Sequence, residues 1–229
     1  MPTNEGYVFT SNRDESPLRY TKDLFHTQEG NYQMIYPKDP KASGTWLAID
    51  NTGNLMCLLN GAFIKHAHRP PYKKSRGILL LELMSKSTPA GIRGYDYNGM
   101  EPFTLIIVLS EDLYEMRWDG QVLHFTPMAN DRPHIWSSCT LYNDEAQSMR
   151  KAWFRELDMT SQDVSIDSML NFHKRGGKQD DYNGFVMNRN NVVQTVSISS
   201  IERSPLKFDF RHECLVTNTV AERSLKIEK

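Results

Sequence analysis

Two neighbouring apolar segments constrain the fold of this chain more than any other feature. Residues 45–50 read Thr-Trp-Leu-Ala-Ile-Asp, residues 55–59 read Leu-Met-Cys-Leu-Leu, and the turn between them contains Gly53. Because glycine adopts positive φ without steric cost, this pattern predicts a β-hairpin. Both strands are mostly apolar on both faces, and each face must then be covered by another layer. The hairpin therefore belongs inside a layered fold, not on a half-solvated sheet.

The elements predicted after this hairpin are strands and helices in separate runs. In chain order they are a buried helix at 77–85 after a cap at Ser75, a meander of strands at 103–109, 113–118 and 121–125, a helix from 143, a helix at 165–174, and a strand pair at 185–187 and 192–201. The first of these helices is expected to cover one sheet. The helix from 143 has a 3.6-residue apolar period, from Ala146 to Leu157. Runs of strands with segregated helices indicate an α+β fold of mainly antiparallel sheets, and we expect one domain over residues 1–229.

Composition excludes several classes of function. Lys plus Arg total 27 against 28 Asp plus Glu, so the chain lacks the basic field of a nucleic-acid-binding protein. No apolar stretch has membrane-spanning length, and the first residues are not a secretion signal. Cys57, Cys139 and Cys214 are far apart, odd in number and set among apolar or β-branched neighbours, which is typical of free thiols. We expect a cytoplasmic protein that binds a small molecule, with no nucleic acid partner and no membrane span.

A polar and charged cluster, Asn12 to Glu15, follows a short β-type run at residues 6–9. It places an amide, a guanidinium and two carboxylates in consecutive positions, which is more than a surface turn needs. Charge this close to a strand end favours a site with chemistry. The alternative is an ordinary solvated turn, in which Asp14 caps the segment that follows.

The residues in front of this run indicate a partner strand that the sequence does not contain. If residues 3–6 form a tight hairpin turn, the residues in front of the turn pair antiparallel with strand 7–12. The numbers of the two residues in each pair then sum to about nine. Too few residues precede the turn to complete that pairing. A full partner needs roughly five to seven further residues, the first of which would lie beside Arg13 and Asp14. We therefore expect the fold to lack its first strand in this sequence.

A second candidate is the dipeptide Asn60-Gly61, which ends the second apolar strand. An amide side chain at a strand end can donate a hydrogen bond to a developing oxyanion, and glycine lets the backbone approach closely. The alternative is an Asn-Gly turn without catalytic use.

A third candidate is the basic stretch at residues 65–76, which contains five Lys or Arg and no acidic residue. Such a stretch can bind a carboxylate or phosphate at the mouth of a site, with Arg76 at its end, or it can be a solvated loop. His66 and His68 resemble a metal pair, but no Cys, Asp or Glu nearby in the sequence completes a ligand set. We predict no metal and no cofactor.

The segment 134–142 precedes the helix from 143 and contains a thiol and several pocket-type side chains. Cys139 is either a nucleophile near a helix N-terminus, where the pKa of a thiol falls, or a buried structural cysteine, which we favour. Trp136 and Ser138 are expected to line a pocket.

Several motifs together resemble the NRDE family, which includes the transport and Golgi organisation protein 2 group. They are Thr10 to Glu15, Gly44-Thr45-Trp46-Leu47, Leu59-Asn60-Gly61-Ala62-Phe63, Ser75-Arg76-Gly77, Gly99 to Phe103, His134 to Tyr142, Val186-Met187-Asn188-Arg189 and Thr195-Val196-Ser197-Ile198. The likeness covers the whole chain, and the motifs together are highly specific to the short bacterial members. The family is grouped with N-terminal nucleophile hydrolases, so the resemblance implies a four-layer αββα sandwich.

The resemblance also implies roles for individual residues in an amide (C–N) hydrolase. Asp14 would orient the terminal amine, Arg13 would hold the thiolate or a substrate carboxylate, and Asn60 would supply the oxyanion donor. We count Asn12 with this catalytic set, and Trp46, Arg76, Trp136 and Ser138 as substrate-binding candidates. In related acylases a second Asn falls near Ser138, and many members have Arg at the position of Gln194, so both positions depart from the pattern.

The nucleophile of such a hydrolase is an N-terminal cysteine, whose free amine acts as general base. This sequence begins Met-Pro-Thr, so we expect an upstream start with Cys at its head and a chain that is inactive as written. Animal members of the family are linked to haem and lipid handling. The resemblance therefore leaves a second function open, a non-catalytic binding or trafficking protein for haem or another hydrophobic anionic ligand. A third alternative makes Pro2 a catalytic amine after Met1 is trimmed.

Overall fold

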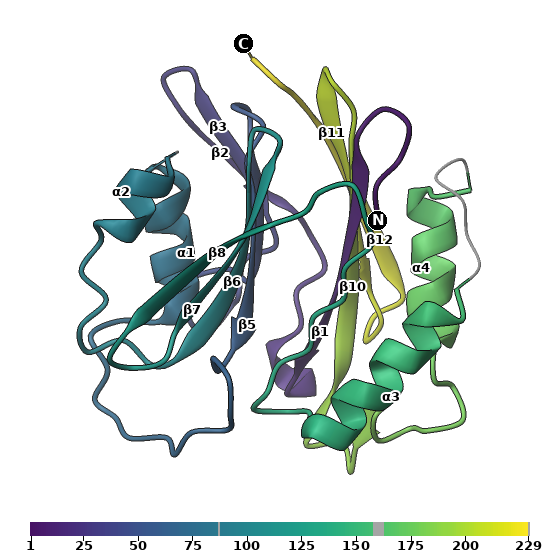
Figure 1. Cartoon of the computed structure of the whole chain (residues 1–229). Helices are drawn as coiled ribbons and strands as arrows, with labels where there is room; N and C mark the ends of the chain where they lie inside the picture. Colours follow the sequence, from purple (N-terminus) through teal and green to yellow (C-terminus); the bar gives the residue numbers. More distant parts are fainter. Residues whose placement is uncertain (87, 158–162, 229) are drawn as a thin grey trace.

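The computed structural model describes residues 1–86, 88–157 and 163–228, and they form four layers (Figure 1). Two antiparallel sheets face each other, and a pair of helices covers the outer face of each sheet. The helices are α1 (Arg76–Met84), α2 (Pro89–Arg93), α3 (Asp144–Arg155) and α4 (Ile166–Arg175). This confirms the α+β fold and the αββα sandwich expected from the sequence.

One sheet is a seven-stranded meander in which every strand pairs with its neighbour in sequence. Its strands are β2 (Phe25–Glu29), β3 (Tyr32–Tyr36), β4 (Leu47–Asp50), β5 (Leu55–Asn60), β6 (Phe103–Leu109), β7 (Asp112–Trp118) and β8 (Leu123–Met128). The predicted hairpin is β4–β5 and the predicted meander is β6–β8. Every residue of β4 and β6 is buried, as the apolar pattern on both faces requires.

The second sheet brings the N-terminal strand together with the C-terminal third of the chain. Its strands are β1 (Tyr7–Glu15), β9 (Asn188–Arg189), β10 (Val193–Arg203), β11 (Lys207–Cys214) and β12 (Thr219–Lys226). The order is β1-β10-β11-β12, and the short β9 also pairs with β10. Since β1 pairs with β10 alone among the named strands, its other side is an edge of the sheet.

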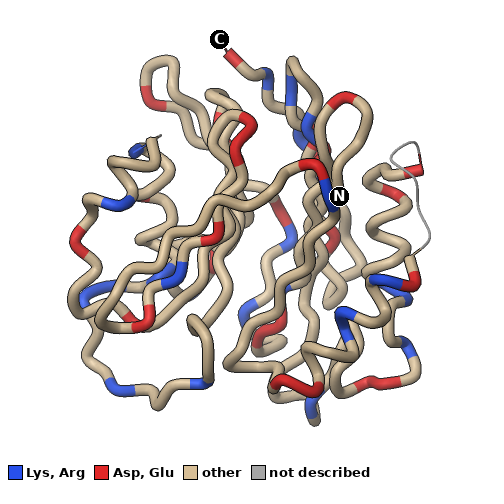
Figure 2. Tube along the Cα trace, viewed as in Figure 1, with Lys and Arg blue, Asp and Glu red and all other residues tan. Residues whose placement is uncertain are grey.

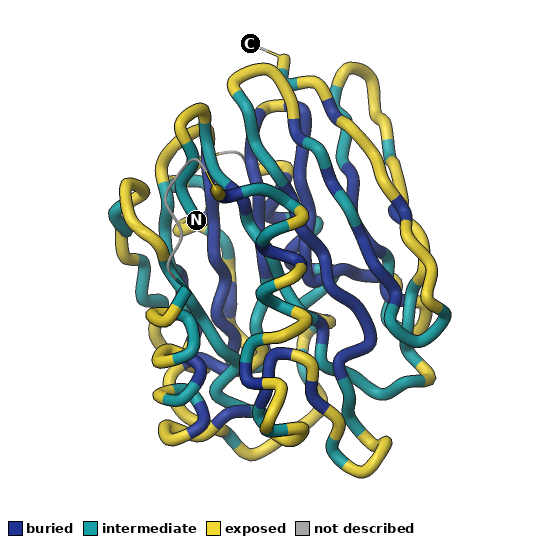
Figure 3. Tube along the Cα trace, turned by 90° about the vertical axis from the view of Figure 1, so that its right-hand side faces the viewer, coloured by how far each residue is buried: buried dark blue, intermediate teal, exposed yellow. Residues whose placement is uncertain are grey.

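The core between the two sheets is continuous and apolar. Leu47, Ile49 and Ile106 from the meander pack with Ile201 and Phe210 from the second sheet, and each is at most 1% exposed. A separate core lies between the meander and α1–α2. Viewed from the side of α3 and α4, many exposed residues lie on helices and loops, and buried strand segments lie behind them (Figure 3). Helices therefore cover the outer face of each sheet, although β12 is mostly exposed.

Charged residues of both signs are interspersed over the trace in the view of Figure 2. Within the described ranges, no helix combines the length and the apolar composition needed to cross a membrane.

The structure differs from the expectations about local structure at three places. Asn12 to Glu15 is not a solvated turn, because β1 continues through it to Glu15 with a bulge between Arg13 and Asp14. Residues 185–187 are not a strand. Their backbone groups bond partly to side chains, since the carbonyl of Phe185 accepts from Asn12 and the N–H of Met187 donates to the hydroxyl of Thr195. The N–H of Phe185 and the carbonyl of Met187 bond to the backbone of Gly176 and Thr195. The hairpins β2–β3 and β11–β12 were not predicted, because most of their strands alternate polar and apolar residues too weakly.

The predicted pairing at the start of β1 is present. Thr3 donates from its N–H to the carbonyl of Gly6, and Pro2 forms a bridge with Tyr7. Met1 and Val8 exchange two hydrogen bonds, of 2.8 and 3.0 Å. Both pairs have position numbers that sum to nine, as the count from the sequence required.

Candidate functional site

A cavity of about 630 Å³ lies between the two sheets and wraps around the edge of β1. Its wall includes all eight residues that the sequence singled out, namely Asn12, Arg13, Asp14, Trp46, Asn60, Arg76, Trp136 and Ser138. This volume falls within the range of small-molecule sites, about 300–1,000 Å³. The structure therefore places the eight candidates in one cavity, although they come from five separate segments of the chain.

β1 contributes residues from both of its faces to the wall of the cavity. The N–H and C=O of Val8 bond to Met1, so they point away from β10. In an antiparallel strand alternate residues repeat this direction, so Thr10 and Asn12 turn their backbone groups to the same edge. The side chains of Ser11 and Arg13 face the meander, whereas Asn12 contacts the layer of α4. A segment bound along this edge would contact both halves of the cavity.

Asp14 is held in place by two hydroxyl donors. The hydroxyl of Tyr142 donates to Oδ2 at 2.7 Å, and the hydroxyl of Thr195 donates to Oδ1 at 2.6 Å. Thr195 is the strand partner of Asp14 across the sheet, and the bulge after Arg13 turns the carboxylate toward both donors. The two hydrogen bonds fix the orientation of the carboxylate.

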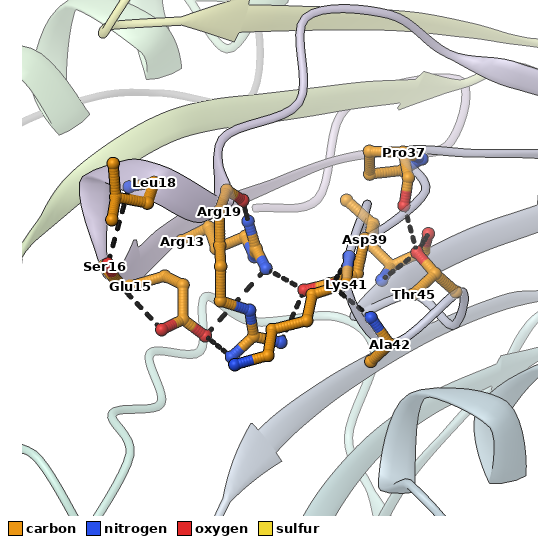
Figure 4. A network of polar contacts seen from close by, with 11 residues as sticks. Arg13, Glu15, Ser16, Leu18, Arg19, Pro37, Asp39, Lys41, Ala42 and Thr45 are labelled. Carbon is orange, nitrogen blue, oxygen red and sulfur yellow. Dashed lines mark hydrogen bonds and ion pairs between the residues drawn. The ribbon is translucent and has the colours of Figure 1, made fainter.

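Arg13 is buried, and its charge is balanced by a buried carboxylate (Figure 4). Its guanidinium contacts Oδ2 of Asp39 and the carbonyl of Arg19, and its carbon lies 4.2 Å from the ring centroid of Trp46. Arg19 bonds to the same Asp39 oxygen at 2.7 Å. Burial alone would raise the pKa of Asp39, but the N–H groups of Ala42 and Lys41 and the two guanidinium groups hold it below its usual value. Arg13 is therefore committed to an internal ion pair.

Asn12 joins β1 to the helical layer. Its Nδ2 donates to the carbonyl of Phe185 at 2.6 Å, so its Oδ1 is free to accept from Nδ1 of His173 at 2.7 Å. Burial lowers the pKa of His173 to about 3, and the positive charges of Arg150 and the chain's amino terminus act in the same direction. His173 is neutral at pH 7, and both polar atoms of the Asn12 side chain are in use.

Asn60 lies across the cavity at the end of β5, and its side chain is exposed. Its amide group has no hydrogen-bond partner among the described residues, so it is available to a ligand. The next residue, Gly61, has φ +80°, and a Cβ there would lie 2.5 Å from Sγ of Cys139. The hydroxyl of Ser138 donates to the carbonyl of Asn60 at 2.8 Å. These contacts hold the backbone of Asn60 against the segment that contains Ser138 and Cys139.

Arg76 reaches the cavity because two glycines let α1 approach β4. A Cβ on Gly44 would lie 2.4 Å from the carbonyl carbon of Gly77. Arg76 itself pairs with Glu101 at 3.1 Å and donates to the carbonyl of Pro102 at 3.0 Å. Its charge is thus already balanced.

Glu101, which is distant in the sequence, lies beside the two histidines of the basic stretch. Its Oε1 lies 3.1 Å from Nε2 of His66 and 3.2 Å from Nδ1 of His68. However, the other oxygen pairs with Arg76, and no group of described Cys, His, Asp or Glu residues is arranged to hold a metal ion.

Trp136 and Trp46 present aromatic surface to the cavity in different ways. The indole N–H of Trp136 donates to Oε2 of Glu115 at 2.8 Å, and its ring stacks on His134. The indole nitrogen of Trp46 is buried and has no hydrogen-bond partner in the described part of the chain. Trp46 therefore carries an unused donor at the cavity wall.

The thiols of Cys57 and Cys139 lack the environment of a nucleophile. Burial raises the pKa of Cys57 to about 12, although Cys57 lines the cavity beside Ser11. Burial also raises the pKa of Cys139, which lines a separate pocket next to α3. The favoured structural role of Cys139 agrees with this environment.

Sequence reasoning did not single out Tyr142, Thr195, His173 or Arg150. Tyr142 and Thr195 were quoted within longer motifs, but their contacts with Asp14 join residues more than a hundred positions apart. Arg150 could have been found, because it follows Ala146 by four residues and precedes Trp153 by three. This spacing places it on the apolar face of the helix.

Comparison with solved structures supports the fold. A mutant of conjugated bile acid hydrolase from Clostridium perfringens aligns with a TM-score of 0.57 and 8% identity, covering 100% of this chain and 95% of that one. The Caenorhabditis elegans orthologue of N-acylethanolamine-hydrolyzing acid amidase aligns with a TM-score of 0.45 and 10% identity, covering 85% and 86%, which is too weak to bear on the fold. The chain therefore shares its overall fold with the bile acid hydrolase structure.

Comparison with known sequences identifies the family. No curated protein matches the chain. The family model described as Transport and Golgi organisation 2 matches residues 3–203, which include β1 and all eight residues of the candidate site. The chain therefore belongs to the Transport and Golgi organisation 2 family.

Proposed function

We propose that the cavity is the active site of an amide (C–N) hydrolase, whose nucleophile is an N-terminal cysteine on a strand that pairs with the edge of β1. The edge itself carries the proposal. The backbone groups of Thr10 and Asn12 at this edge have no partner among the described residues, and by the pairing count a strand bound there would begin beside Arg13 and Asp14. Its first residue would then lie within reach of the fixed Asp14 carboxylate.

The chemistry follows from these positions. The α-amine of the cysteine, with a pKa near 8, takes the thiol proton, and the thiolate attacks the amide carbon. The amide of Asn60 donates to the oxyanion. The C–N bond then breaks as the ammonium returns its proton to the leaving amine, and water hydrolyses the thioester to release the acid and restore the thiol. Asp14 orients the α-amine, whereas the charge of Arg13 is already balanced by Asp39.

The test uses a protein extended by a Cys-headed β-type segment in front of Met1. Hydrolysis of a panel of acyl p-nitroanilides should appear in this protein, disappear with Ala in place of the new Cys, and persist at a lower rate with Ser. Asn60→Ala should lower kcat about 10²- to 10³-fold, the usual cost of an oxyanion donor. Asn130→Ala is the matched control, because Asn130 also lines the cavity but has no role in the proposed mechanism. Its side chain donates to the carbonyl of Glu111. Equal activity with and without the new Cys would refute the proposal.

A second candidate is a carrier of haem or another apolar anion. The cavity wall favours it, since Val8, Ile106, Val108 and Leu113 line the same space as several guanidinium groups. Such a carrier needs no nucleophile. Tight haem or acyl-ligand binding that is indifferent to the added Cys, together with absent hydrolysis, would favour the carrier over the enzyme.

A further inference from the structure

One arginine in the cavity wall stands apart from the others. Arg150, on α3, is 5% exposed and forms no ion pair with any described carboxylate within 4 Å. The other buried or half-buried guanidinium groups in the wall are all paired, Arg13 and Arg19 with Asp39 and Arg76 with Glu101. A buried charge is normally paired, because its desolvation costs several kcal/mol.

The contacts of Arg150 hold the guanidinium in place without neutralising it. Its Nη1 donates to the carbonyls of Asn183 and Gly184 at 2.9 and 2.8 Å, and its Nε donates to the hydroxyl of Ser137 at 3.2 Å. Its carbon lies 4.1 Å from the ring centroid of Tyr142 and 4.4 Å from that of Phe185. The remaining nitrogen, Nη2, has no hydrogen-bond partner among the described residues. Two N–H donors are therefore left on a rigidly held cation.

Ser137 adds a third donor at the same place. Its hydroxyl oxygen accepts from Nε of Arg150, so its proton remains available to another acceptor. Nε and Nη2 lie on the same side of a guanidinium, which is the side that binds a carboxylate in bidentate pairs. Ser137 and Nη2 are thus placed to meet the two oxygens of one anionic group.

The surroundings favour a negative charge on an apolar body. Two groups of this region could otherwise carry charge: His173, which burial keeps neutral, and Asp14, whose two oxygens accept from Tyr142 and Thr195. The adjoining wall is apolar and includes Val8, Phe154, Met169 and Phe185. This combination fits an amphipathic acid better than a free inorganic anion.

We propose that Arg150 and Ser137 form a binding site for the carboxylate of a ligand whose apolar body lies against α3 and α4. The inference rests on the cavity being the ligand site, as proposed above, and does not require the nucleophile. It applies equally to a substrate with a carboxylate and to a carried acid.

The test is a calorimetric titration of the 229-residue chain with octanoate, and with octanol as a neutral probe of the same apolar length. Wild-type protein should prefer octanoate. Arg150→Gln should weaken octanoate binding at least ~10-fold, as expected for a charge-assisted hydrogen bond, and leave octanol binding unchanged. Arg189→Gln is the matched control, because Arg189 also stacks on Tyr142 but lines the separate pocket, and it should change neither affinity.

Ser137→Ala keeps the proposal testable if Arg150→Gln does not fold. It leaves the aromatic packing of Arg150 intact and should weaken octanoate binding several-fold without affecting octanol. Equal affinity of wild-type protein for the two probes, no binding of either, or an equal loss of both in the folded variants would overturn the proposal. Because no hydrolysis is measured, the result is independent of whether the extended protein is an amidase.

Discussion

The hydroxyl of Tyr142 donates a 2.7 Å hydrogen bond to the carboxylate of Asp14, across 128 positions of sequence. Tyr142 is 2% exposed, so its hydroxyl is largely removed from solvent. Tyr142→Phe removes the donor and leaves the carboxylate with Thr195 alone. We expect the free energy of unfolding, measured with urea at pH 7, to fall by ~1.5–3 kcal/mol, the range for hydrogen bonds to charged groups.

Tyr182→Phe is the control for this change. Tyr182 is 54% exposed, so loss of its hydroxyl should alter the unfolding free energy by less than ~0.5 kcal/mol. Equal effects of the two substitutions would show that the Asp14 contact contributes nothing specific.

The ion pair between Arg13 and Asp39 predicts a second effect. Asp39→Asn leaves a buried guanidinium with weaker partners and should lower stability at pH 7 by ~3–5 kcal/mol. The folded pKa of Asp39 lies below 3.8, so the stability it contributes is complete above pH 3.8 and is lost as the pH falls through the folded value. Urea unfolding of both proteins should therefore differ less at pH 2 than at pH 7. A difference that does not depend on pH would contradict the ion pair.

His173 predicts a pH effect at higher pH. The unfolded imidazole takes up a proton near pH 6.5, but the folded one does so only near pH 3, so stability falls as the pH drops between these values. From pH 7 to pH 5 this loss amounts to ~2 kcal/mol. His173→Gln retains an amide that can donate to Asn12 and should remove that part of the loss. Some dependence of stability on pH should remain, because burial also lowers the pKa of His212.

His26→Gln is the control for this prediction, because His26 is exposed on β2. It should leave the difference in stability between pH 7 and pH 5 unchanged. A His173→Gln protein with the wild-type difference would show that His173 is not the group responsible.

Local sequence patterns predicted the elements that contain runs of adjacent apolar residues. The β4–β5 hairpin and the β6–β8 meander have apolar runs and turn glycines, and both were predicted with small errors at their ends. The strands β2 and β12 were not predicted, because most of their residues are exposed and polar. Asn12 to Glu15 could be taken for a turn because all four residues are polar or charged, although cross-strand pairing with β10 holds the segment extended.

The candidate site was predictable only in part. Arg13, Asp14 and Asn60 stand in recognisable motifs, but the contacts that decide their roles are long-range. Nothing near Arg13 in the sequence shows that Asp39 neutralises it, and nothing near Arg150 shows that no described carboxylate does. Charge balance inside a cavity depends on the fold, so the sequence pointed to Arg13 as the ligand's cation whereas the structure favours Arg150.

The most direct test of the proposed hydrolase is the intact mass and N-terminal residue of the protein purified from its own cells. We predict an N-terminal cysteine, a short β-type segment in front of Met1, and a mass above the 26.5 kDa of this chain. A native protein that begins at Met1 or Pro2, with the mass of this sequence, would contradict the proposal.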